Sequence, residues 1–160
     1  MGRNRTDIAG RTRPLGLTEL PVTGRVYVDS QIVIYLVEEH PDYLRRVKPL
    51  WERAESGEIA LITSALAVME CLVIPYRLSD AERAKDYEYG FFHSEIETVE
   101  VDLNILRRAA QLRATSPGLR TPDAIHVATA FEAQCSYIVT NDLHINAFPD
   151  LSVVYLQDVS

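Results

Sequence analysis

The sequence predicts an α/β protein built on a parallel five-stranded sheet flanked by helices. Three observations support this fold class. Five short stretches are rich in β-branched and other apolar residues, stretches with helical spacing lie between most of them, and no segment is repeated. Strands that alternate with helices of roughly 10–15 residues are typical of βαβ units, whose strands run parallel. A chain of 160 residues suits a single domain of this kind.

The strands are predicted where β-branched residues gather or where apolar and polar residues alternate. In chain order they are RVYVDS at 25–30, EIALITS at 58–64, IETVEVD at 96–102, SYIVTND at 136–142 and LSVVYLQ at 151–157. Because parallel sheets bind ligands beyond the carboxyl ends of their strands, the residues that end these stretches are the first candidates for a site.

The helices are predicted from apolar residues at helical spacing and from their end signals. In chain order they cover 31–40, 41–57, 64–78, 79–94, 103–114 and 121–135. Ser30, Ser79 and Thr121 are the expected N-caps of the first, fourth and sixth helices. Pro122 follows Thr121, which is a strong start signal because proline suits the first helical position.

Proline and glycine are expected to interrupt or end the first three helices. Pro41 should end the first, Pro49 should kink or break the second, and Gly57 should stop it. The third helix should end near Pro75. These signals limit each of the three helices to a few turns.

Composition restricts the class of protein. The net charge is −7 and the pI is about 5.1, which argues against binding nucleic acid through a basic surface alone. No apolar run is long enough to span a membrane and no secretory signal is visible, so we expect a cytoplasmic protein. Cys71 and Cys135 are expected to be buried thiols.

The chain is predicted to divide into a flexible basic arm at 1–24 and one domain at 25–160. The arm is rich in arginine, glycine and proline and shows little periodicity. Charge alone leaves two interpretations open, a leader without function and an arm that binds RNA or a partner.

Glu70 is unusual because it lies within the apolar stretch SALAVMECLVI, residues 64–74. An ionised carboxylate among apolar side chains is costly unless it has a partner. The partner is either a basic side chain, such as an arginine, or a bound cation. For a bound cation, Glu70 should face the carboxyl edge of the sheet, while Met69, Cys71 and Leu72 pack inward or against neighbouring helices.

Four carboxylates are expected near that edge. Asp29 ends the first strand, Asp142 follows the fourth, Asp123 lies in the first turn of a helix, and Glu70 lies in the helix after the second strand. Gathered carboxylates repel one another unless cations lie between them. Oxygen ligands suit Mg²⁺ or Mn²⁺, and a metal-bound water can attack a phosphodiester.

Each acid also has a simpler interpretation. Asp29 can be an ordinary strand-end residue, Asp123 a helix N-terminal charge and Asp142 part of a turn. Glu70 can belong to a buried ion pair. His126, one turn after Asp123, either faces the site or packs in the core. The joint placement of the four acids, rather than any one spacing, favours a site.

Four segments, VYVDSQIVIYL, TSALAVMECL, RTPDAIHVATA and YIVTND, occur in the order typical of PIN-domain ribonucleases. The chain resembles this family from about residue 25 to 156, and in particular its VapC-type toxins. The resemblance implies strand order 3-2-1-4-5 and a Mg²⁺- or Mn²⁺-dependent endoribonuclease that leaves 5′-phosphate and 3′-hydroxyl ends. It assigns Asp29, Glu70, Asp123 and Asp142 to catalysis and metal binding, and Ser30 and Thr140 to their support.

The resemblance also implies partners: an RNA substrate such as tRNA or ribosomal RNA, a cognate antitoxin, and a second copy of the chain in a homodimer. Two features depart from the family pattern, the long arm and the segment LHINAFPDL after Asp142. The alternative function is a PIN-like protein that binds RNA or a partner without cutting. A phosphatase with an aspartate nucleophile is disfavoured, because Gln31 stands where such enzymes carry a second aspartate.

Overall fold

The computed structural model describes residues 24–158, so the predicted arm lies outside the described residues except for Gly24. Five parallel strands form one sheet in the order β3-β2-β1-β4-β5. The strands are β1 (Arg25–Val28), β2 (Ala60–Ser64), β3 (Ile96–Val99), β4 (Tyr137–Thr140) and β5 (Ser152–Tyr155). The predicted fold class and strand order are therefore confirmed.

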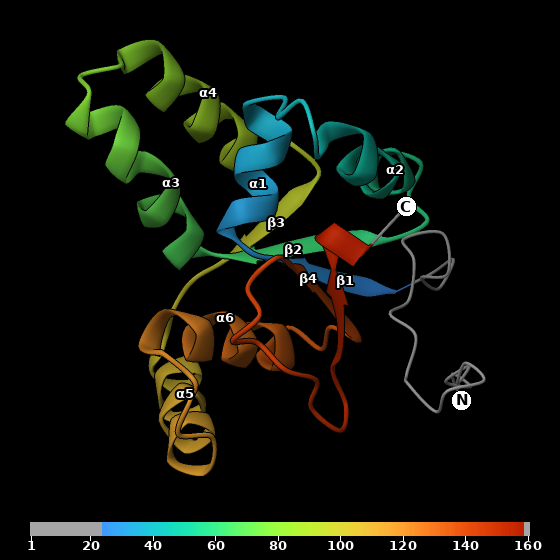
Figure 1. The fold of residues 1–160 in the computed structure, drawn as a ribbon, viewed down its shortest axis with the longest axis vertical. Coiled ribbons are helices and arrows are strands. Elements are labelled where there is room, and N and C mark those ends of the chain that lie inside the picture. Colours follow the sequence, from blue (N-terminus) through green and yellow to red (C-terminus); the bar gives the residue numbers. More distant parts are fainter. Residues whose placement is uncertain (1–23, 159–160) are drawn as a thin grey trace.

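Helices cover both faces of the sheet (Figure 1). They are α1 (Ser30–Val37), α2 (Leu44–Glu55), α3 (Ala65–Arg77), α4 (Ala81–Phe92), α5 (Leu103–Thr115) and α6 (Thr121–Glu132), and a short 3₁₀ turn η2 (Leu156–Asp158) follows β5. Helices α1 to α4 pack on one face, and α5 and α6 pack on the other. Within residues 24–158, no helix is long and apolar enough to cross a membrane.

The central strands are buried on both faces, as expected for a parallel sheet. Val26 and Val28 of β1 pack in the core beneath α1 to α4, whereas Tyr27 between them packs on the side of α6. This alternation follows from the two-residue period of a strand. Cys71 and Cys135 are free and buried, as the sequence predicted.

The predicted N-caps were wrong by one residue at three helices. Asp29 caps α1 in place of Ser30, and Asp80 caps α4 in place of Ser79. Both aspartates accept hydrogen bonds from backbone N–H groups of the first turn, and a carboxylate also complements the helix dipole there. Helix α6 has Arg120 at its N-cap, and Thr121 instead accepts a hydrogen bond from Arg113.

The predictions for two internal prolines had different outcomes: the break at Pro49 does not occur, whereas the end of α3 near Pro75 is confirmed. Helix α2 continues through Pro49, and α3 continues past Pro75 to Arg77. A proline removes one backbone hydrogen bond, and tertiary packing provides most helical stability. In α2 the buried side chains of Val47, Leu50 and Ala54 supply that packing on both sides of the proline.

Candidate functional site

The first candidate residue, Asp29, is fixed between β1 and α1. Its backbone ends the strand, and its Oδ1 accepts the Ile32 N–H at 3.2 Å as the cap of α1. Thr140, the last residue of β4, donates its hydroxyl to Asp29 Oδ2. Because β1 and β4 are parallel neighbours, they deliver both side chains to the same edge of the sheet.

Asp29 is almost completely buried, with 5% of its surface exposed. Burial raises the pKa of Asp29 above its ordinary value, and the nearby charge of Glu70 adds to this. The charge of His126 and the hydrogen bonds from Thr140 and Ile32 lower the pKa in part, but the net direction is upward. Burial therefore disfavours the ionised form of Asp29.

Thr140 connects Asp29 to Asp142. Its hydroxyl oxygen donates to Asp29 and accepts the backbone N–H of Asp142 at 2.9 Å. This contact agrees with the supporting role expected of Thr140. Ser30 begins α1 and its carbonyl accepts a hydrogen bond from the Cys71 thiol at 3.7 Å, so its supporting role stays a prediction.

Arg120 holds two of the acids together. Its Nε donates to Asp123 Oδ2 at 2.8 Å, its Nη2 lies 3.3 Å from Asp123 Oδ1, and Nη2 also donates to Asp142 Oδ2. Hydrogen bonding to Asp123 and the charges of both acids raise the pKa of Arg120. The single positive charge of the guanidinium is thus shared by two of the four carboxylates that were predicted to hold a metal ion.

Asp142 receives further hydrogen bonds from His144. The His144 backbone N–H and Nδ1 lie 2.9 Å and 2.8 Å from Asp142 Oδ1. Partial burial raises the pKa of Asp142, but the hydrogen bonds from His144 and the charge of Arg120 outweigh this, and the pKa is lowered. Asp142 is therefore ionised more readily than Asp29, although Thr140 links the two.

Glu70 has a partner within the chain, and it is a histidine. His126 Nε2 lies 2.6 Å from Glu70 Oε1, and His126 Nδ1 lies 2.6 Å from the Tyr27 hydroxyl. The expected partner was a bound cation or an arginine. Cys71 and Leu72 pack inward as expected, but Met69 is 56% exposed, so that part of the expectation was wrong.

The sequence and the fold match a known family. A model of the PIN domain family matches residues 26–151, most of the chain. The chain belongs to the PIN domain family. The resemblance predicted from the sequence is confirmed at the level of this family. No curated protein is significantly similar in sequence to this PIN domain.

Several solved structures share the fold. VapBC2 from Rickettsia felis, bound to a promoter DNA fragment, has a TM-score of 0.59 at 17% identity and covers 81% of this chain and 96% of its own. A toxin–antitoxin complex from Klebsiella pneumoniae has a TM-score of 0.58 at 22% identity, covering 82% and 97%. VapC20 from Mycobacterium tuberculosis, described as a sarcin–ricin loop cleaving toxin, has a TM-score of 0.58 at 15% identity, covering 71% and 86%.

The acids of this PIN domain do not form a complete metal group by themselves. Among residues 24–158, no three acidic, histidine or cysteine side chains are arranged so that they could hold a metal ion. Arg120 binds Asp123 and Asp142, and His126 binds Glu70, so three of the acids contact basic side chains. The donor chemistry, four carboxylates, still fits a hard divalent cation that replaces Arg120.

Arg120 was not identified as a site residue from the sequence. For His126 the sequence left two interpretations, facing the site or packing in the core. The available signal for Arg120 was its position three residues before Asp123, a spacing at which side chains meet on a helix. His126 was placed one turn after Asp123, but its partners lie 99 and 56 residues away in the sequence. Such contacts depend on how α6 packs on the sheet and where it approaches α3, which local patterns do not specify.

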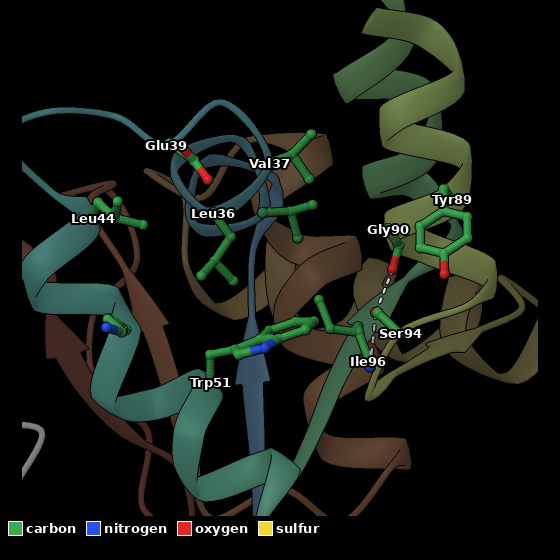
Figure 2. Close-up of a pocket in the computed structure, with 11 residues that line it drawn as sticks. Leu36, Val37, Glu39, Leu44, Trp51, Tyr89, Gly90, Ser94 and Ile96 are labelled. Carbon is green, nitrogen blue, oxygen red and sulfur yellow. Dashed lines mark hydrogen bonds between the residues drawn. The ribbon is translucent and has the colours of Figure 1, made fainter.

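A separate apolar pocket of about 450 Å³ lies among α1, α2, α4 and the start of β3. Leu36 of α1, Trp51 of α2 and Tyr89 of α4 point toward it, and Ile96 lies at its base (Figure 2). Ser94 orders the turn beside it by donating to the Gly90 carbonyl and accepting the Ile96 N–H at 3.2 Å. The four acids do not line this pocket.

Proposed function

We propose that this PIN domain is a Mg²⁺- or Mn²⁺-dependent endoribonuclease and the toxin of a toxin–antitoxin pair. The main observation in support of this proposal is the burial of Asp29 at the carboxyl edge of the sheet, where the pKa of its carboxyl group is raised. A bound divalent cation would supply the positive charge that this carboxylate lacks. The family match and the description of VapC20 as a cleaving toxin support the choice of RNA.

In this proposal Asp29, Glu70, Asp123 and Asp142 hold the metal. When bound, the metal lowers the pKa of the attacking water and stabilises the leaving oxygen. The chain keeps these acids in place: Thr140 fixes Asp29 and the Asp142 backbone, and the first turn of α6 fixes Asp123. Hydrolysis then leaves a 5′-phosphate and a 3′-hydroxyl on the RNA.

The test is RNA cleavage by the purified chain. We expect defined cuts in total RNA with Mn²⁺ or Mg²⁺, no cuts with EDTA, and recovery when the metal is restored, read by sequencing the RNA 5′ ends. The same preparation of an Asp29→Asn variant controls for contaminating nucleases. Cuts that persist in EDTA, or that the variant makes equally, would contradict the proposal.

One observation favours the alternative, a PIN-like protein that binds RNA or a partner without cutting. Arg120 and His126 already satisfy three of the acids, so the site has cations or donors of its own. The two functions differ in one measurement. A nuclease should bind Mn²⁺ in an Asp29-dependent way and become more stable to heat with it, whereas the binding protein should not.

Arg120 provides a direct test of how the metal enters. We expect Arg120→Ala to tighten Mn²⁺ binding roughly tenfold, since the ion no longer competes with the guanidinium for two carboxylates. Electron paramagnetic resonance of free Mn²⁺ measures this. Arg108→Ala, which removes an arginine of similar exposure bound to Glu132, should leave the affinity unchanged. Unchanged or weaker binding by Arg120→Ala would contradict competition.

Two protein partners complete the proposal. We propose that an apolar helix of the antitoxin binds the pocket beside Trp51 and Tyr89, since apolar grooves of this kind accept amphipathic helices. The complexes from R. felis and K. pneumoniae support an antitoxin partner. For the homodimer we propose the exposed apolar side chains of α3. They are Met69, Val73, Ile74 and Tyr76. A cytoplasmic location agrees with the two free cysteines.

A further inference from the structure

One buried pair near the site has no part in the function proposed above. His126 of α6 is 3% exposed and Tyr27 of β1 is fully buried. Their side chains lie 2.6 Å apart at His126 Nδ1 and the Tyr27 hydroxyl, and the rings meet edge to face with centroids 5.8 Å apart. The other ring nitrogen, Nε2, lies 2.6 Å from Glu70 Oε1. Three elements, β1, α6 and α3, are thus joined through one imidazole ring.

The hydrogen-bond chain has a defined direction. An ionised carboxylate can only accept hydrogen bonds, so the hydrogen between His126 and Glu70 belongs to Nε2. The other ring nitrogen, Nδ1, shares a hydrogen bond with the Tyr27 hydroxyl. The Nε2–H group then donates to Glu70 Oε1. This direction leaves Glu70 as the acceptor at the end of the chain.

We propose that His126, held by Tyr27, is a positioning residue that orients Glu70 toward the metal ion; this inference rests on the proposed function. A glutamate has several rotatable bonds, and Glu70 lies on the side of α3 that is only partly buried. The bond from His126 fixes Oε1 and leaves Oε2 to bind the cation. Partners of this kind, one step removed from the metal, set the orientation of the ligand and typically contribute 10–100-fold to metal affinity.

The observations separate this role from simple core packing. A packing histidine needs only apolar neighbours and one satisfied nitrogen, whereas both nitrogens of His126 have short bonds to groups on different elements. One of these groups is the acid that the sequence left without a partner. Thr129 lies one turn later on α6 and is equally buried, but its hydroxyl bonds only within the helix, to the Ile125 carbonyl at 2.7 Å.

The experiment measures Mn²⁺ binding to the full chain by electron paramagnetic resonance, with no RNA present. We expect His126→Leu to weaken Mn²⁺ binding about 10–100-fold. His126→Gln, whose amide can donate from the place of Nε2, should restore affinity to within about threefold of the wild type. Tyr27→Phe should weaken it less than His126→Leu does. Thr129→Val is the matched control and should bind like the wild type.

The outcomes distinguish this inference from the proposed function. Thermal unfolding in EDTA identifies the variants that fold. If His126→Leu does not fold, His126→Gln is measured in its place. Equal affinity of wild type, His126→Leu and Thr129→Val, with Glu70→Gln still weakened, would overturn the positioning role alone. If the wild type does not bind Mn²⁺, or Glu70→Gln binds as tightly, the proposed metal site and the positioning role are both overturned. If His126→Leu binds Mn²⁺ weakly and His126→Gln does not restore the affinity, the positioning role is overturned and His126 acts through packing.

Discussion

Replacing Asp29 with asparagine is expected to change activity and stability in opposite directions. RNA cleavage should fall by about 10²–10³-fold or more, because the variant loses a metal-binding charge at the centre of the proposed site. The metal-free protein should become more stable, since a neutral amide avoids the cost of burying a carboxylate whose pKa is raised. A rise in melting temperature in EDTA on the order of 2–4 °C corresponds to about 1 kcal/mol for a domain of this size.

The pH dependence of this stability difference follows from the direction of the pKa shift. Burial raises the pKa of Asp29 in the folded protein above the unfolded value of 3.8. The folded state therefore binds the proton more tightly, and the contribution of Asp29 to stability is fully present below pH 3.8 and is lost as the pH rises through the folded pKa. The advantage of the asparagine variant should appear over that same rise and be absent in acid.

Melting curves in EDTA across this pH range test the expected change in stability, and RNA cleavage with Mn²⁺ tests the expected loss of activity. Asp150→Asn, at an exposed carboxyl group after Pro149, is the matched control and should change neither quantity. A less stable Asp29→Asn variant would show that other contacts already compensate for the charge of Asp29. Wild-type cleavage by the variant would remove Asp29 from the proposed site.

Strand positions could be predicted from the sequence because each strand carries its own pattern of β-branched residues. β1 and β4 occur where RVYV and YIVT predict them. Strand order is different, because it depends on which strands pair across long stretches of chain. The order 3-2-1-4-5 came from the resemblance to the PIN family. The cap errors at Ser30 and Ser79 have a common cause, since each serine lies next to an aspartate that caps more effectively.

The sequence indicated four acids as candidates for the site, but it did not indicate the side chains that contact them. Asp29 follows β1 and Asp142 follows β4 closely, and such positions can be recognised because parallel strands deliver their carboxyl ends to one edge. Arg120 and His126 could not be recognised in this way, because the role of each depends on which side chain it contacts in the folded chain. His126 contacts Tyr27 and Glu70 only once α6 has packed on the sheet and approached α3. The residues next to His126 in the sequence do not specify that packing.

The apolar pocket leads to the second large expected effect. We expect Tyr89→Ala to weaken binding of the cognate antitoxin roughly 30-fold, or about 2 kcal/mol, as for a tyrosine at the centre of an interface. Tyr89 lines the pocket but is 65% exposed, so its removal should hardly change the stability of the free chain. The test titrates the purified cognate antitoxin into the purified chain.

The chain itself contains the reporter for this measurement. Trp51 is its single tryptophan and lies in the same pocket, so its emission should shift as a helix excludes water from the indole ring. Phe92→Ala is the matched control, because Phe92 is as exposed as Tyr89 on the same helix but does not line the pocket. Equal affinities of the two variants, or binding without a change in Trp51 emission, would place the antitoxin elsewhere. A loss confined to Tyr89→Ala would separate the antitoxin surface from the acids, since the pocket contains none of the four.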